Sequence, residues 1–484
     1  MSSSVTATAT QSRERLYLQI YMGITLAVLL LMLLAGVALR AAQGTLINLP
    51  PDLFYQAMSL HGTGMVGIAG LAGVSIMWYF LRRYVALTPG IFLANLLLFT
   101  LGVVMILGAI LLGGFAGGWT FLYPLPASSM GQWNTHAAAA FIGGLLIIGV
   151  GFLLFYLDAG RALLARYGSL GRALGLDQLF SGKVDADHPP TVVASTMVLI
   201  INILGTLAGA VILVMSLINL YLPAVTIDPL WAKNLIYFFG HVFINATIYM
   251  AVIAVYELLP HYTGRPWKLT RPFLAAWAAS TLMVMIVYPH HLLMDMVMPA
   301  WMLIMGQIIS YLSGLPVLLV TAWGTLVQIY RANVNWEAPA RFLVLGVFGW
   351  SIGVIPAIVD GTMTINKVMH NTLWVPGHFH FYLLLGLLPM VLGFMLHVTR
   401  LPDSRIHPLL ERGGFWLFSG SAAAFVVMFL YSGLHSIPRR FAEYLPAWVA
   451  QAQLSTLFGT LVLLSLAAFF ILLLRRLAQV RMQA

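Results

Sequence analysis

The stretch HNTLWVPGHFH, from His370 to His380, places three imidazoles at the start of a long apolar segment. His378 and His380 are two residues apart, so on a helix of about 100° per residue they point to nearly opposite faces. They cannot chelate one ion together, but each can bind a different metal on its own side of the helix. This arrangement suits two hemes that flank a shared helix, each with one axial histidine.

Further histidines lie within other apolar segments. His61 is in LHGTGMVG, His241 is in FFGHVFINATIY, and the adjacent His290 and His291 are in VYPHHLLMD. Neighbouring residues diverge by about 100° on an α-helix. His290 and His291 can therefore share one metal only where the helix is distorted, and Pro289 directly before them is a cause of distortion.

Composition identifies the class of protein that must position these side chains. Hydrophobic residues make up 61% and charged residues 8% of the 484 residues, and the mean hydropathy is +0.93. A soluble domain of this length does not carry that balance, so we predict an all-α, polytopic membrane protein. The chain has no Cys, which excludes disulfides and thiolate-bound metals from it.

Twelve apolar runs are long enough to cross a membrane as helices. Their approximate limits are 16–41, 57–81, 90–115, 133–158, 192–222, 231–259, 272–290, 297–330, 341–365, 371–399, 413–434 and 452–474. Segment 159–190 is the one long polar connection, and residues 1–15 form a polar tail that we do not interpret as a signal peptide. No internal repeat is found, so residues 1–484 are predicted to form a single membrane domain.

The positions of Lys and Arg predict how the chain is oriented. Of the 24 basic residues, 19 lie at the two termini or in connections on one side of the membrane, and the remaining 5 lie on the other side. Positive charge tends to stay inside, so we expect both termini and segment 159–190 to be cytoplasmic. The net charge of +10 thus reflects topology and does not indicate binding of nucleic acid.

This orientation brings six histidines from four spans to a similar depth in the outer half of the membrane. They are His61, His241, His290, His291, His378 and His380. A single intramembrane histidine is usually a hydrogen-bonding partner between helices. Six at one depth indicate function, because ionisable groups inside a bilayer are costly. A transporter that binds a metal as its cargo is an alternative of a different class.

Several motifs occur in the order found in catalytic subunit I of heme–copper oxidases. They are LHG at 60–62, GH at 240–241, PHH at 289–291, HNTLWVPGHFH at 370–380 and PRR at 438–440. Together with the twelve spans they cover essentially the whole chain, which therefore resembles this superfamily, and its B-type branch most closely. The resemblance implies the twelve-helix arrangement of subunit I with both termini in the cytoplasm.

The resemblance also implies roles for the matched histidines. His61 and His380 would be the axial ligands of a low-spin heme that relays electrons, and His378 would bind a high-spin heme. The open side of that heme would face a copper ion bound by three residues: His241, His290 and His291. Three neutral imidazoles suit copper and leave a coordination position free for substrate.

Polar residues near the outer ends of the spans complete the implied heme sites. Arg439 and Arg440 would bind heme propionates, for which the guanidinium fork is suited, although lipid headgroups are an alternative partner. His370 and Trp374 would lie beside the propionates of the high-spin heme, although His370 could simply cap the helix start.

One departure from the family pattern concerns the active-site tyrosine. In A- and B-type O2 reductases this tyrosine lies four residues after the first copper histidine and is bonded to it; here that position is Asn245. C-type enzymes carry it six residues before the histidine pair, where this chain has Val284. Tyr249 and Tyr288 each lie one helical turn from these positions and are possible substitutes.

This departure favours NO over O2 as the substrate. Asn245 cannot supply the hydrogen atom used when an O–O bond breaks, whereas reduction of two NO to N2O needs two electrons and two protons and breaks no such bond. Superfamily members that reduce NO often carry Glu near the metal. Glu257, the only Glu in the sixth and seventh spans, lies about 24 Å of helix rise from His241. Copper is therefore still predicted, since iron sites usually recruit a carboxylate.

The B-type proton path implies two further residues. Tyr256 lies fifteen residues after His241, as in that path, and Thr321 is the nearest hydroxyl after a matching proline, Pro316. The path has fewer hydroxyls than in the B-type pattern, which makes proton pumping of that kind less favoured.

We therefore predict the catalytic subunit of a respiratory enzyme in a bacterial-type cytoplasmic membrane, with two hemes and one copper ion. Its favoured reaction is reduction of NO to N2O, and reduction of O2 to water is the alternative. Because the chain has no Cys, electrons must come from a partner, either a subunit with a cupredoxin-like copper domain or a c-type cytochrome. A non-catalytic assembly or sensor subunit is a further alternative.

Overall fold

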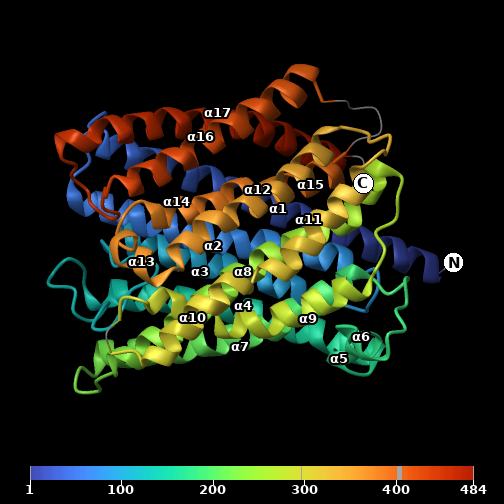
Figure 1. Ribbon diagram of the computed structural model, residues 1–484, viewed down its shortest axis with the longest axis horizontal. Coiled ribbons are helices and arrows are strands. Elements are labelled where there is room, and N and C mark those ends of the chain that lie inside the picture. Colours follow the sequence, from blue (N-terminus) through green and yellow to red (C-terminus); the bar gives the residue numbers. More distant parts are fainter. Residues whose placement is uncertain (1, 296, 401–405, 483–484) are drawn as a thin grey trace.

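The computed structural model describes residues 2–295, 297–400 and 406–482, and the regular elements of these ranges are helices. They run side by side in one elongated bundle (Figure 1). The elements of the first half are α1 (Ser2–Gln43), α2 (Pro51–Leu81), α3 (Pro89–Leu111), α4 (Thr135–Tyr167), α5 (Leu170–Ala173), α6 (Leu176–Ser181), α7 (Pro190–Tyr221) and α8 (Pro229–Thr263). Those of the second half are α9 (Arg271–Ile286), η1 (Tyr288–Leu292), α10 (Ala300–Leu312), α11 (Leu315–Ile329), α12 (Ala338–Asp360), α13 (Met363–Met369), α14 (Trp374–His380), η2 (Phe381–Leu387), α15 (Leu388–Val398), η3 (Leu409–Gly414), α16 (Phe415–Leu434) and α17 (Pro446–Met482).

The twelve predicted spans are confirmed in the described part of the chain. Both chain ends lie at the same end of the bundle, as an even number of crossings requires (Figure 1). Several of the approximate limits differ from the observed ones by a few residues or more, and two of these differences bear on the site or on the polar connection. Helix α4 continues to Tyr167, so the connection after the fourth span is shorter than 159–190, and it contains the short helices α5 and α6. The tenth span begins at Trp374, whereas His370 is the C-cap of the separate helix α13.

Helix α8 lies at the centre of the bundle and packs against α2, α7, α12 and α15. In its most apolar stretch 83% of the residues are buried, against 22% for the span formed by α10 and α11. A helix that is apolar on all sides belongs in the interior of a bundle. The polar side chains of α8, including His241 and Asn245, therefore face other helices and not lipid.

Four spans depart from α-helical geometry, and one of them is the eleventh, which begins with the π-helix η3. The seventh changes to a 3₁₀-helix at Tyr288–Leu292, which confirms the distortion predicted at Pro289. The eighth is broken between Leu312 and Leu315, where the Ser280 hydroxyl donates to the Ser313 carbonyl over 3.0 Å. The tenth contains a π-helix, η2. Such irregular turns gather at functional sites, and buried partners must satisfy the backbone groups that they free.

Close backbone contact fixes the tenth span against α12. A Cβ added at Gly349 would lie 2.1 Å from the Leu385 carbonyl oxygen, and one at Gly346 would lie 2.8 Å from that of Gly386. Only glycine permits two backbones to approach this closely. Helix α12 thereby holds the π-helical turn that follows the two histidines of α14.

Candidate functional site

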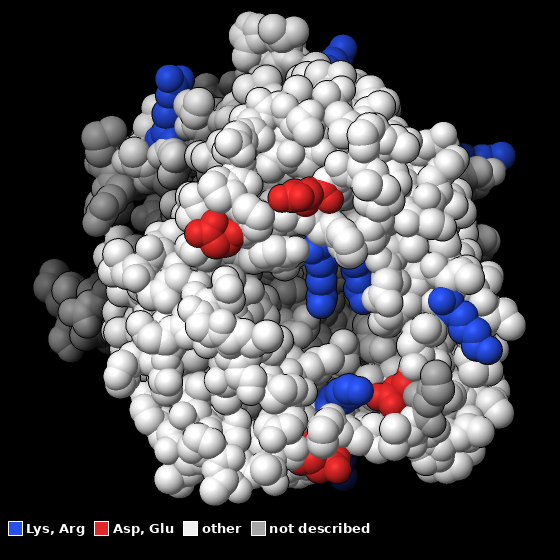
Figure 2. Space-filling view, turned by 90° about the vertical axis from the view of Figure 1, so that its left-hand side faces the viewer, with Lys and Arg blue, Asp and Glu red and all other residues white. Residues whose placement is uncertain are grey.

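The predicted histidines meet in one cavity of about 550 Å³. The face of the molecule that lies at the left of Figure 1 is hollowed, with basic and acidic side chains around the hollow (Figure 2). Seven histidines from five separate elements line the cavity: His61, His241, His290, His291, His370, His378 and His380.

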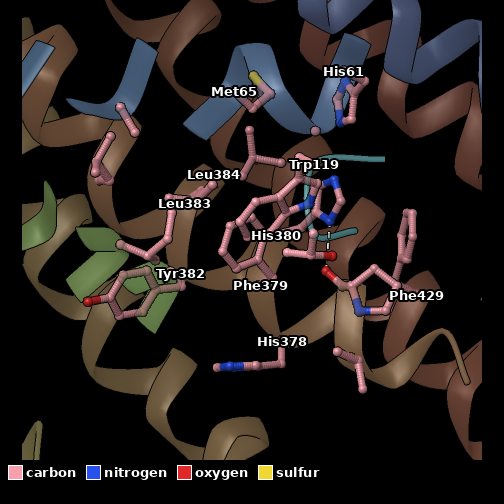
Figure 3. A pocket seen from close by; sticks show the side chains of 18 of the residues that line it. His61, Met65, Trp119, His378, Phe379, His380, Tyr382, Leu383, Leu384 and Phe429 are labelled. Carbon is pink, nitrogen blue, oxygen red and sulfur yellow. Dashed lines mark hydrogen bonds between the residues drawn. The ribbon is translucent and has the colours of Figure 1, made fainter. Parts of the chain in front are cut away.

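Helix α14 divides this cavity into two sites. His380 faces His61 of α2; their ring centroids are 6.2 Å apart and their planes differ by 13°. The His378 ring lies on the other side of the helix, as Figure 3 shows. The sequence prediction that these two histidines point to opposite faces is therefore confirmed.

Backbone carbonyls orient the paired rings of the first site. His61 Nδ1 lies 2.7 Å from the Met32 carbonyl oxygen, and His380 Nδ1 lies 2.7 Å from that of Pro376. Since a carbonyl oxygen only accepts, each Nδ1 carries the hydrogen and each Nε2 keeps a free lone pair. Helix α1 comes close enough to contact His61 because it has Gly36, where a Cβ would lie 2.7 Å from His61 Cε1.

The second site is a cluster of three histidines from α8 and the 3₁₀-helix η1. His241 Nδ1 lies 3.0 Å from His291 Nε2, and the His290 and His291 ring centroids are 4.2 Å apart. One nitrogen from each of the three residues lies within 4.8 Å of the others. Metal–imidazole bonds are about 2 Å long, so small shifts of these rings would let them bind one ion.

Asn245 closes the far side of this cluster. Its Nδ2 lies 2.7 Å from His241 Nε2, one helical turn along α8. Among the described residues, the metal-binding group contains three histidines and no carboxylate. Glu257 is held at the inner end of α8 by Arg83, at 3.3 Å, and by the Tyr84 hydroxyl, at 2.9 Å.

The two tyrosines suggested as substitutes lie differently. The Tyr288 hydroxyl donates to Asn234 Oδ1 over 2.8 Å, and Tyr288 is not among the described residues that line the cavity. Tyr249 does line the cavity, with its ring against Trp277 and Trp350 at centroid distances of 5.6 and 6.1 Å. Among the described residues, neither hydroxyl is hydrogen-bonded to Asn245.

Sequence reasoning missed a third tyrosine, Tyr382 of η2. Its hydroxyl donates to Asn245 Oδ1 over 3.3 Å, and it lines the same cavity. The sequence carried a signal, because Tyr382 is four residues after His378 and such pairs lie on one side of a helix. The contact with α8, however, depends on how two distant helices pack.

Positive charge collects at the outer mouth of the cavity, which Arg439 and Arg440 both line. Burial and the charge of Arg440 lower the pKa of Arg439 to about 10. Burial, together with both guanidinium groups, lowers the pKa of His370 to about 4. These shifts indicate a place that favours a bound anion.

Trp374 does not point toward this mouth, because its indole N–H donates to the Pro356 carbonyl over 3.0 Å.

A polar route lies on the inner side of the cavity. The hydroxyls of Tyr256 and Thr321 share a hydrogen bond of 2.7 Å. Thr325, one turn further along α11, has a buried hydroxyl without a partner in the described part of the chain. Beyond it the Thr263 hydroxyl donates to Gln328 over 2.8 Å. The two predicted residues are thus in contact, and the stripe continues through residues that were not predicted.

Comparison with known proteins gives matches over most of the chain. Residues 17–467 match the family described as "Cytochrome C and Quinol oxidase polypeptide I". The chain is 25% identical over 427 residues to cytochrome c oxidase subunit 1 of Thermus thermophilus, which covers 82% of this chain and 70% of that protein. It is 23% identical over 359 residues to the Candida albicans protein of the same name, covering 72% of this chain and 64% of that protein. The match thus spans a little under two thirds of the Candida relative.

A solved structure also has the same fold. A chain from a cryo-EM structure of a heme-copper terminal oxidase dimer has a TM-score of 0.79 and 19% sequence identity to this chain. The match covers 96% of this chain and 84% of that one. The similarity therefore extends to the whole bundle and not only to the motifs that hold the histidines.

Proposed function

Because this chain belongs to the cytochrome c and quinol oxidase polypeptide I family, we propose that it is the catalytic subunit of a respiratory heme–copper enzyme that reduces NO to N2O. Electrons would pass from a low-spin heme to a centre formed by a high-spin heme and copper. The single observation that favours NO is the contact between Asn245 Nδ2 and His241 Nε2.

The first site fits a heme that His61 and His380 would hold between them. Two metal–nitrogen bonds of about 2 Å, and about 1 Å from each nitrogen to its ring centre, separate two ring centres by about 6 Å. The observed separation of His61 and His380 is 6.2 Å. Both Nε2 atoms are free of hydrogen and both Nδ1 atoms are fixed by carbonyls, as is usual for metal-binding histidines.

The second site fits a heme on His378 and copper on three histidines: His241, His290 and His291. The donor set is entirely imidazole among the described residues, which suits copper, whereas a non-heme iron site usually includes a carboxylate. Bound copper would supply a redox-active ion that can accept and pass on electrons at this site. The 3₁₀ turn of η1 brings the nitrogens of His290 and His291 close to His241, whose ring is hydrogen-bonded to Asn245.

The outer mouth of the cavity fits the carboxylates of heme. Arg439 and Arg440 line it, and no carboxylate lies within ion-pair distance of either in the part of the chain that the structure describes. Heme propionates would place negative charge beside these two guanidinium groups, with His370 next to them. The Trp374 N–H is not available for this contact, since it already donates to the Pro356 carbonyl.

Electron delivery requires a partner on the outer side, where the cavity opens. The chain has no Cys and therefore no thiolate copper centre of its own. We propose a partner subunit with a cupredoxin-like copper domain or a c-type cytochrome. Protons would come from the inner side through Tyr256 and Thr321, whose hydroxyls are in contact.

The chemistry of residue 245 favours NO as the substrate. Cleavage of O2 in one step uses a hydrogen atom from a phenol, and an amide cannot release one at an accessible potential. Two NO molecules, two electrons and two protons give N2O and one water without breaking an O–O bond. Reduction of O2 is the second candidate, favoured by Tyr382, whose hydroxyl lies 3.3 Å from Asn245.

Steady-state turnover of the purified complex with NO and with O2, using one reduced donor, tests this proposal. Fast consumption of NO with formation of N2O, and slow uptake of O2, is the expected result. Rapid uptake of O2 without formation of N2O from NO would contradict it. The absence of heme absorbance would instead support the metal-transporter alternative.

A further inference from the structure

A chain of side chains links η2 to the three-histidine cluster across two helices. The Tyr382 hydroxyl donates to Asn245 Oδ1 over 3.3 Å, and Asn245 Nδ2 lies 2.7 Å from His241 Nε2. On its other edge, His241 Nδ1 faces His291 Nε2 at 3.0 Å. Asn245 therefore contacts the His241 ring at Nε2, and Tyr382 acts on the ring through Asn245. A metal bound at Nδ1, on the opposite edge, would touch neither of these two residues.

The proton on His241 decides the direction of this chain of hydrogen bonds. A neutral imidazole carries one hydrogen. In the orientation seen here, Asn245 Nδ2 donates to Nε2, so the hydrogen is on Nδ1 and can point at His291. If Nδ1 gives its lone pair to a metal, the hydrogen must lie on Nε2, which then becomes a donor and needs an acceptor.

A half-turn of the Asn245 amide supplies that acceptor. Its oxygen and nitrogen exchange places at almost no steric cost, and the two orientations of an amide are distinguished only by their hydrogen bonds. After the exchange, Oδ1 accepts from His241 Nε2 and Nδ2 donates to the Tyr382 oxygen. The Tyr382 hydrogen is then released from Asn245 and can donate into the cavity that Tyr382 lines.

We propose that Tyr382 and Asn245 form a hydrogen-bond relay that positions His241 for copper and reverses direction when the metal binds. Tyr382 is a positioning residue in this account, because it acts on the metal ligand through Asn245. The proposal rests on the proposed function, since it assumes that copper is bound by the three histidines. It assigns a task to Tyr382 that neither Tyr249 nor Tyr288 can perform with the contacts described above.

The affinity of the purified complex for copper tests whether this relay positions His241. Groups that hydrogen-bond to metal ligands typically contribute about 10–100-fold to metal affinity. Tyr382→Phe should therefore weaken copper retention against a chelator about tenfold, with the low-spin heme spectrum unchanged. Tyr156→Phe is the matched control, because Tyr156 is also a buried tyrosine that is hydrogen-bonded to an asparagine, Asn202, over 2.8 Å. It should retain copper as the unmodified protein does.

Two substitutions at Asn245 test the direction of the relay. Asn245→Leu removes both hydrogen bonds and should weaken copper binding by about 10–100-fold. Asn245→Asp offers only acceptor oxygens, so it satisfies a hydrogen on Nε2 but cannot donate to that atom. We expect Asn245→Asp to retain far more copper than Asn245→Leu. Equal losses in both variants would overturn the proposed reversal.

A spectroscopic signature separates positioning from a general loss of stability. The infrared band of CO bound to the reduced complex responds to the ligands and hydrogen bonds around it. Tyr382→Phe should shift this band, and Tyr156→Phe should not. Unchanged copper affinity and an unchanged band in Tyr382→Phe would overturn the relay alone. Full copper retention in His290→Ala would instead overturn the ligand set, and with it the proposed function.

Discussion

The two sites beside α14 are built from the same side chain but are held in opposite ways. On one side, His61 and His380 face each other as near-parallel rings, and a backbone carbonyl holds each Nδ1. On the other side, His241 is held by a side chain, Asn245, which is itself in contact with Tyr382. The backbone carbonyls of a helix have a fixed direction, whereas a side-chain amide or hydroxyl can rotate and change the direction of its hydrogen bonds.

This difference matches what each site would have to do under the proposed function. A relay for electrons needs two fixed ligands and no open position, because reorganisation would slow transfer. A site that binds and reduces a substrate needs an open position and hydrogen bonds that can adapt. The distorted segments also belong to the second site. The 3₁₀-helix η1 supplies His290 and His291, and the π-helix η2 supplies Tyr382. The carbonyl contacts of the first site come from α1 and α14.

Replacing a histidine ligand by alanine should have the largest effect, because it should remove one heme from the protein. His378→Ala should remove the high-spin heme signal and leave the low-spin signal, because only the second site loses its iron ligand. His380→Ala should do the reverse, and each variant should lose one heme per chain. Optical and electron paramagnetic resonance spectra of the purified complexes distinguish the two. If His378→Ala instead lost only the low-spin signal, His378 would be the ligand of the low-spin heme and His380 that of the high-spin heme.

Restoring a tyrosine in place of the adaptable amide should alter substrate preference. Asn245→Tyr should raise the rate of O2 reduction relative to NO reduction by about tenfold or more, since a positioned proton donor contributes about 10²–10⁴-fold. The measurement is steady-state turnover with each gas, and Asn245→Gln, which keeps an amide, is the control. A rate with O2 that stays the same or falls would count against the role given to residue 245.

Interruption of the inner hydroxyl route should slow turnover without changing either heme. Tyr256→Phe or Thr321→Val breaks the 2.7 Å hydrogen bond between these residues and should lower turnover by about tenfold, within the range for a lost proton-transfer group. Thr281→Val is the control, because the Thr281 hydroxyl donates only to the Trp277 carbonyl of its own helix, over 2.7 Å. Full activity in both route variants would place proton entry elsewhere.

Removal of one positive charge at the outer mouth should have the smallest effect. Arg439→Gln should lower the midpoint potential of a heme by some tens of millivolts, because a nearby positive charge stabilises the added electron. Arg439→Lys keeps the charge and should shift the potential less. Redox titration of the purified complex makes this comparison. Unchanged potentials would indicate that Arg439 contacts lipid headgroups and not heme.

Much of this architecture can be predicted from sequence because it follows local rules. Apolar length identifies the twelve spans, and the two-residue spacing of His378 and His380 places them on opposite faces of α14. The distortion at η1 follows from Pro289 beside two histidines that must share one site. Each of these features depends on residues close together in the chain.

The features that sequence reasoning missed depend on contacts between distant helices. Tyr382 reaches Asn245, 137 residues away, because η2 is a π-helix packed closely on the glycines of α12. Trp374 was expected at the heme propionates, but the Pro356 carbonyl of α12 takes its N–H. His370 caps the end of α13, a short helix without a long apolar pattern to indicate it.

Metal analysis combined with electron paramagnetic resonance of the purified, unmodified complex tests the contrast between the two sites most directly. We expect two hemes and one copper per chain, with one heme low-spin and bound by two histidines and the other high-spin. Two low-spin hemes, or iron in place of copper at the three-histidine cluster, would contradict it.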